Sequence, residues 1–70
     1  MKLKSKTYNS VIIEITKSEL IESGFEKIWD EIREQYSASE YEIENFKENN
    51  EKTILYIELK IKKNFKILEN

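Results

Sequence analysis

The alternation of apolar and polar residues over 52–63 constrains the fold more than any other feature of the sequence. Every second residue from Leu55 to Ile61 is leucine or isoleucine, and the residues between them are tyrosine, glutamate and lysine. The same period of two occurs within residues 2–15 and 40–45. Because neighbouring side chains of a strand point to opposite faces, these three stretches are predicted to be strands.

Between the first two of these strands the period is that of a helix. The apolar and aromatic residues recur three or four positions apart and share one stripe: Ile21, Phe25, Ile28, Trp29, Ile32 and Tyr36. Capping boxes at 16–19 and 23–26 predict either one helix over 18–36 or a short turn followed by a helix over 24–36. Gly24 would cost about 1 kcal/mol in a helix interior and favours the second start.

The order of elements is therefore β-α-β-β, which predicts a single small α+β domain over residues 1–70. It would be a three-stranded mixed sheet with one amphipathic helix on one face. The third strand is the most apolar and is expected in the centre, while the helical crossover lets the first strand run parallel to either of the others. A break near Asn9 and Ser10 would turn residues 2–15 into a small hairpin.

The register of the last two strands follows from the requirement that helix-facing side chains pair with one another. This requirement pairs Ile43 with Ile57 and needs a three-residue loop, 49–51. Phe46 is then expected opposite Ile54 on the other face of the sheet.

The 70 residues include no histidine, no cysteine and one glycine, which excludes most catalytic chemistry. The thiolate nucleophile, the usual general base near neutral pH and the commonest metal ligand are all missing. A phosphate-binding loop needs several glycines. The chain is therefore expected not to be an enzyme, and we assign no catalytic residue, metal ligand or cofactor.

The ends and the composition give an expectation about location. The first six residues include three lysines and no apolar segment of a signal peptide, and the longest apolar run in the chain is 54–57. A cytoplasmic protein without a membrane segment is expected. Lys, Ile, Glu and Asn supply 41 of 70 residues, a bias towards A/T-rich codons that is frequent in small proteins of phages and mobile elements of AT-rich hosts.

One helix covers only one face of a sheet, so the other face is expected to be open. The residues at its centre would be apolar or aromatic: Tyr8, Ile12, Phe46, Ile54 and Tyr56. An apolar centre with a charged rim is typical of a protein-binding patch, and a twofold homodimer is its simplest use. Two other interpretations stay open. The tail, through Phe65, Ile67 and Leu68, covers this face, or the exposed strand residues have no function.

A row of carboxylates is predicted along the solvent side of the helix. Its members are spaced four residues apart: Glu22, Glu26, Asp30 and Glu34. This spacing is similar to that of DNA phosphates and would suit the basic groove of a partner protein. The formal net charge of only -2 makes an ordinary solvated helix face the simpler interpretation.

These features predict a non-enzymatic protein-protein interaction module, in particular a small phage- or mobile-element-encoded inhibitor of a host defence or nucleic-acid-processing protein. A structural or assembly protein fits the same features. The alternative is a nucleic-acid-binding regulator that uses lysines and tyrosines of the terminal strands: Lys2, Lys4, Lys6, Lys60, Lys62, Tyr8 and Tyr56. The negative net charge and the glutamates on the same face count against nucleic acid.

Overall fold

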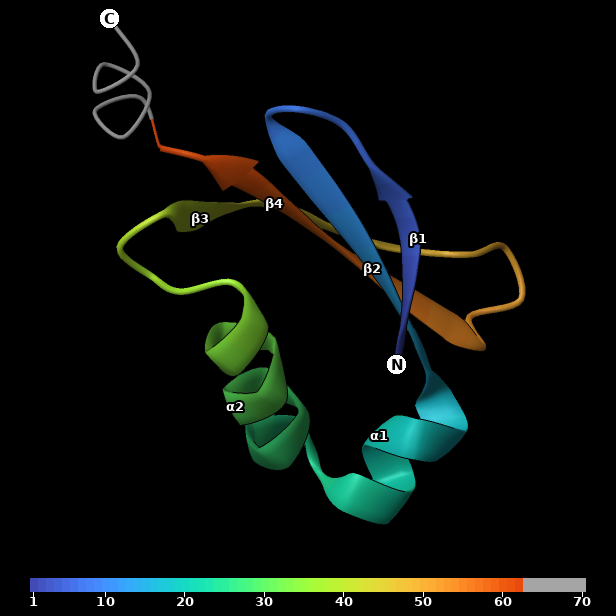
Figure 1. The fold of residues 1–70 in the computed structure, drawn as a ribbon. Helices are drawn as coiled ribbons and strands as arrows, with labels where there is room; N and C mark the ends of the chain where they lie inside the picture. Colours follow the sequence, from blue (N-terminus) through green and yellow to red (C-terminus); the bar gives the residue numbers. More distant parts are fainter. Residues whose placement is uncertain (63–70) are drawn as a thin grey trace, which may run out of the picture.

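The computed structural model describes residues 1–62 and places them in four strands and two helices. The elements follow one another in chain order: β1 (Lys2–Lys6), β2 (Ser10–Thr16), α1 (Lys17–Ser23), α2 (Phe25–Gln35), β3 (Tyr41–Glu48) and β4 (Ile54–Ile61). The strands form one sheet in the order β1-β2-β4-β3, and both helices lie on the same side of it (Figure 1). The predicted α+β class and the central position of the last strand are confirmed.

The sheet differs from the expected one in the number and direction of its strands. Residues 2–15 form the β1–β2 hairpin because a local turn closes between the strands. The Thr7 backbone N–H donates to the Ser10 carbonyl at 2.9 Å, and the Ser10 N–H donates to the Thr7 hydroxyl at 3.1 Å. The predicted mixed sheet is wrong, since all neighbouring strands are antiparallel. β2 and β3 run in the same direction, but β4 lies between them.

The core lies between the helices and the helix-facing side of the two central strands. Its fully buried side chains come from β2, β4 and α2: Val11, Ile13, Ile15, Ile28, Ile32, Ile57 and Leu59. Burying one such side chain stabilises the fold by about 1.5–3 kcal/mol. Neither edge strand of the described sheet, β1 or β3, contributes a fully buried side chain, so these edges are the least covered part of the sheet.

The helical segment is broken into two helices at Gly24, whose φ of 84° is a conformation that glycine adopts most readily. The first capping box is confirmed, because the Glu19 N–H donates to the Thr16 hydroxyl and the Thr16 N–H donates to the Glu19 carboxylate. The second box is wrong, since α2 begins at Phe25 and its N-cap is Gly24, which provides no side-chain hydrogen bond. The break also removes part of the expected buried stripe: Ile21 is 84% exposed and Phe25 is 45% exposed.

The register between β3 and β4 differs from the predicted one because the loop is longer. The Asn49 side-chain oxygen accepts hydrogen bonds from the N–H groups of Thr53 and Ile54, at 2.8 and 3.0 Å, so the loop spans 49–53 rather than 49–51. A bulge at Glu44 then shifts the pairing once more.

As a result of this shift Ile43 lies opposite Leu59, not Ile57. Phe46 lies opposite Ile57, whose side chain is in the core beneath the helices. Phe46 is therefore on the helix-facing side of the sheet, and its predicted position on the open face is wrong.

No helix within residues 1–62 is both long and apolar enough to cross a bilayer.

Candidate functional site

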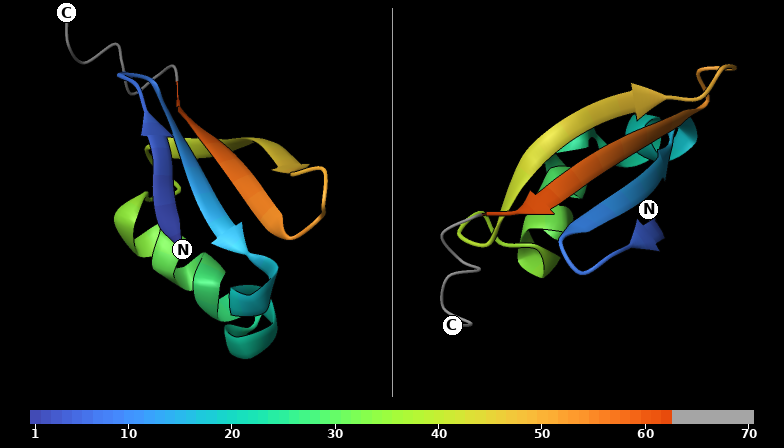
Figure 2. Two further views of the ribbon diagram at one scale, coloured as in Figure 1. Left: turned by 90° about the vertical axis from the view of Figure 1, so that its right-hand side faces the viewer. Right: turned by 90° about the horizontal axis from the view of Figure 1, so that it is seen from above.

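The face of the sheet turned away from the helices, called the open face below, is uncovered within the described residues. Seen from above, the four strands lie side by side with the helices behind them (Figure 2, right). Ile12, Ile54 and Tyr56 all point to this face, so three of the five apolar or aromatic residues predicted at its centre come together there. Each is half-buried among its neighbours. Phe65, Ile67 and Leu68, which were considered as a cover for this face, lie outside the described residues.

The open face contains a hollow of about 180 Å³. Residues from all four strands line it: Lys4, Ile12, Asn45, Lys47, Tyr56 and Glu58. Its base is apolar and aromatic, and the Lys4 ammonium lies 4.8 Å from the centre of the Tyr56 ring, within the range of a cation-π contact. Pockets for small ligands have volumes of about 300–1,000 Å³. This hollow is therefore the size of a single protruding side chain and not of a whole substrate.

Two bulges in the edge strands shape this hollow. In β1 the pairing to β2 passes from Leu3 to Ser5, which leaves Lys4 as the extra residue, and in β3 Glu44 is the extra residue before Asn45. A bulge reverses the alternation of side chains beyond it. Asn45 and Lys47 therefore lie on the open face beside Glu58 and Tyr56, where an uninterrupted alternation from Ile43 would have put them on the helix side. No sequence signal marks either bulge, so Asn45 and Lys47 were not predicted on this face, whereas Lys4 was expected there as one of the lysines of a nucleic-acid surface.

Ion pairs with glutamates neutralise the charge of two lysines on the open face. Lys2 lies 3.6 Å from Glu14, and Lys60 lies 3.0 Å from Glu44. The hydrogen bond and the negative charge of Glu44 raise the pKa of the Lys60 amine above its usual value. Lys47 makes no ion pair within residues 1–62, and Lys4 has only the Tyr56 ring as a partner there.

The lysines expected to form a nucleic-acid surface do not share one face. Because of the bulge at Lys4, Lys6 lies opposite Val11, on the helix-facing side, while Lys2 lies opposite Glu14 on the open face. Tyr8 lies in the turn between β1 and β2 and is highly exposed. The described surface therefore holds single lysines next to glutamates and not a continuous basic stripe.

The predicted carboxylate row is divided by the break at Gly24. Glu22 lies on α1, whereas Glu26, Asp30 and Glu34 are exposed along α2. Arg33, the one arginine of the sequence, makes no ion pair with these carboxylates within residues 1–62. Its guanidinium lies 4.7 Å from the Trp29 ring centre and donates to the carbonyls of Tyr36 and Tyr41, both at 3.3 Å.

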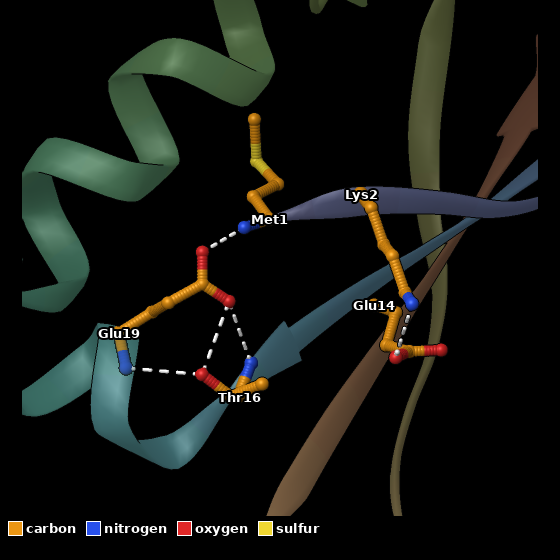
Figure 3. A network of polar contacts seen from close by, with 5 residues as sticks. All are labelled: Met1, Lys2, Glu14, Thr16 and Glu19. Atoms are coloured by element: carbon orange, nitrogen blue, oxygen red, sulfur yellow. Dashed lines mark hydrogen bonds and ion pairs between the residues drawn. The ribbon is translucent and has the colours of Figure 1, made fainter.

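A network at the amino end of β1 holds this strand against β2 and α1 (Figure 3). The Met1 amine contacts one oxygen of Glu19, and the other oxygen of the same carboxylate accepts the Thr16 backbone N–H at 3.0 Å. Lys2 contacts Glu14 beside this network. Because β1 carries Lys4, these contacts help to place one wall of the hollow.

The titratable groups show ion pairing at the surface. The hydrogen bond and positive charge of Lys17 lower the pKa of the exposed Glu48 carboxyl, as Glu44 raises that of Lys60. Neither group lies in an enclosed cleft, where perturbed pKa values point to catalysis. Within residues 1–62 no three acidic, histidine or cysteine side chains are grouped to hold a metal ion.

No known relative is shown by comparison with other proteins: no protein-family model, no curated protein and no solved structure matches the chain. Function is therefore inferred from the surfaces of the sheet and helices. Among these, the hollow on the open face combines concave shape, an aromatic base and two lysines, Lys4 and Lys47, that make no ion pair within residues 1–62.

Proposed function

We propose that this chain is a non-enzymatic protein-binding module whose open face receives a side chain of its partner in the hollow over Tyr56. The observation that carries the proposal is the hollow itself, which lies at the centre of the uncovered face and is lined from all four strands. Tyrosines in such central, well-packed positions are frequent binding hot spots. Occupying a partner's surface is enough for inhibition, so the inhibitor of a host protein expected from the sequence is the form of this function that we favour.

The lining of the hollow supports one class of partner side chain. Ile12 and the Tyr56 ring offer apolar contact area, and Lys4 and Lys47 stand at the rim without an ion pair in the described part of the chain. An apolar or aromatic side chain flanked by aspartate or glutamate would fit both the apolar base and the lysines at the rim. Among the described residues of the lining, Glu58 is the one acidic side chain and leaves the local charge positive.

Selection from a displayed library of random peptides tests this proposal, because it needs no chosen partner protein. Selected peptides are expected to contain an apolar anchor next to acidic residues and to shift the amide resonances of β2 and β4. Their binding should be lost in Tyr56→Ala and weakened in Lys4→Glu. Ile21→Ala is the matched control, because this side chain is 84% exposed on the opposite side of the molecule. Peptides that bind Tyr56→Ala as well as the unchanged protein would contradict the proposal.

One observation favours nucleic acid as the second candidate. Tyr56 lies between two lysines, an arrangement on which single-stranded bases can stack. Binding of this kind weakens steeply with salt, so a complex should be detectable at a low concentration of about 50 mM salt. A titration with single- and double-stranded DNA at that salt concentration separates the two functions. Formation of a salt-sensitive complex that Tyr56→Ala removes would favour the nucleic-acid regulator over the protein-binding module.

A further inference from the structure

We propose that two copies of this chain associate through the β3 edge of the sheet, with Ile43 of each copy opposite Phe46 of the other. The two β3 strands would run antiparallel about a twofold axis and join the sheets into one. This inference concerns the edge of the sheet and does not depend on what the open face binds, although Lys47 belongs to both the edge strand and the rim of the hollow. It also differs from the homodimer through the open face that the sequence predicted, which stays a prediction.

The two edges of the described sheet differ in their protection against strand pairing. β1 has the sequence KLKSK, and lysines along an edge strand discourage pairing with another strand. β3 instead carries Ile43 and Phe46, which are 41% and 47% exposed although they lie on the helix-facing side of the sheet. Exposed apolar side chains on an edge strand favour association at that edge.

The backbone of β3 also presents its hydrogen-bonding groups at these two residues. The Lys62 N–H donates to the Glu40 carbonyl, and the Asn49 N–H donates to the Ile54 carbonyl. At both ends of the strand these bonds show which residues turn their backbone groups towards β4. Because bonded positions alternate along an antiparallel pair, Ile43 and Phe46 turn their N–H and C=O groups away from β4.

The backbone N–H and C=O of Tyr41 also point away from β4, but both already make hydrogen bonds. Its N–H donates to the Ser37 carbonyl at 2.9 Å, and its carbonyl accepts from the Arg33 guanidinium at 3.3 Å. The segment from Ile43 to Phe46 is therefore the part of this edge that can accept another strand.

The bulge at Glu44 determines the register in which two copies match. In a strand without a bulge, the residues on one face are two positions apart, so their numbers are all even or all odd. Two copies of such a strand could bring together on one face only residues from that set. With one extra residue between them, Ile43 and Phe46 lie on the same face although their numbers differ by three. The pairing of Ile43 with Phe46 of the second copy therefore brings apolar side chains together on the helix side and joins backbone groups that point outward.

The same register brings opposite charges together on the other face. Glu42 lies next to Ile43, and Lys47 lies next to Phe46, so Glu42 meets Lys47 of the second copy. Neither makes an ion pair within residues 1–62 of a single copy. Opposite charges directly across a strand pair favour the pairing, whereas a self-pairing of β1 would place lysines near lysines.

The solution mass is the first test, measured by sedimentation over a series of concentrations up to the solubility limit. The expected result is a mass approaching twice the 8.5 kDa of the chain. Ile43→Lys and Phe46→Lys should each return the mass to that of one chain, and Ile21→Lys, which removes an exposed isoleucine from α1, should not. Circular dichroism checks that each variant is folded. A single-chain mass for the unchanged protein at all concentrations would overturn the proposal, as would a dimer that neither β3 variant weakens.

Cysteine pairing tests the register, and the chain has no cysteine of its own to interfere. Glu42 and Lys47 of the second copy would form a non-hydrogen-bonded pair with Cα atoms about 4.5 Å apart, a separation that a disulfide can span. Glu42 and its own equivalent would lie about 15 Å apart along the strands, which a disulfide cannot span. A mixture of Glu42→Cys and Lys47→Cys chains should therefore cross-link under mild oxidation, while each variant alone should not. Cross-linking of either variant with itself, or none in the mixture, would overturn this register.

Discussion

At the scale of single residues, Thr16 joins the end of β2 to the start of α1. Its hydroxyl accepts the Glu19 N–H, and its own N–H donates to the Glu19 carboxylate, which also contacts the Met1 amine. Thr16→Ala removes this cap and should lower the free energy of unfolding by about 1 kcal/mol. Urea denaturation measures the loss. Ser18→Ala, an exposed change in the first turn of the same helix, should leave the midpoint almost unchanged. Equal effects of the two substitutions would contradict the role of the cap.

Gly24 sets the angle between the two helices through its backbone alone. Its φ and ψ are 84° and 146°, a combination that L-residues rarely adopt, and a Cβ at this position would meet no atom within 4 Å. Gly24→Ala should therefore destabilise the protein by about 1–3 kcal/mol through backbone strain and not through a clash. A chain synthesised with D-alanine at position 24 provides the control, since it accepts positive φ. Thermal melting should show a larger loss for the L-residue than for the D-residue, and equal losses would point to crowding instead.

At the scale of elements, periodicity predicts where the strands and helices form, and side-chain hydrogen bonds decide how they join. Alternation located β4 and identified the buried faces of β2 and β4, because it records which side of each strand avoids water, whereas residues 2–15 were expected as one strand with the hairpin as an alternative. The loop after β3 was misjudged because the Asn49 side chain binds the backbone beyond the expected turn. The bulges at Lys4 and Glu44 were missed for a related reason: a bulge depends on how two strands fit together, which neither strand shows by itself.

An ion pair joins α1 to the end of β3, and the stability that it contributes is expected to depend on pH. The Lys17 ammonium lies 2.5 Å from the Glu48 carboxylate and lowers its pKa in the folded state. A lowered folded pKa adds stability above the unfolded pKa of the carboxyl, and this stability is lost as pH falls through the folded pKa.

Glu48→Gln should therefore lower the melting temperature slightly at neutral pH and have no effect at a pH below the folded pKa of Glu48. The difference should also shrink in high salt. Glu51→Gln, an exposed change in the neighbouring loop, is the matched control. A deficit for Glu48→Gln that persists at low pH would show that the side chain acts through packing and not through its charge.

At the scale of the whole molecule, the helices cover the central strands and leave the β3 edge and the open face without a neighbour in the described chain (Figure 2, left). A domain of this size buries a smaller share of its surface than a larger domain does, so association can contribute substantially to its stability. The open face and the β3 edge differ in kind. The open face holds half-buried apolar residues among charges and a hollow, whereas the β3 edge holds exposed apolar residues and outward backbone groups.

This division of surfaces predicts that folding and association are linked. A dimer that forms only from folded chains stabilises the folded state by mass action, so the melting temperature rises with protein concentration. The unchanged protein should show this rise, followed by circular dichroism over a range of concentrations, because pairing of the β3 edges buries Ile43 and Phe46 together. Ile43→Lys should melt at one temperature at every concentration, since it abolishes the pairing without changing the core of each chain.

Tyr56→Ala separates the two surfaces in the same experiment. It alters the base of the hollow on the open face and leaves the outward groups of the β3 edge as they are. Its melting temperature should be lower because a half-buried aromatic side chain is lost, but it should keep the slope with concentration that the unchanged protein has. Loss of the slope in Tyr56→Ala, with the slope retained in Ile43→Lys, would move the self-association to the open face and leave the β3 edge unpaired.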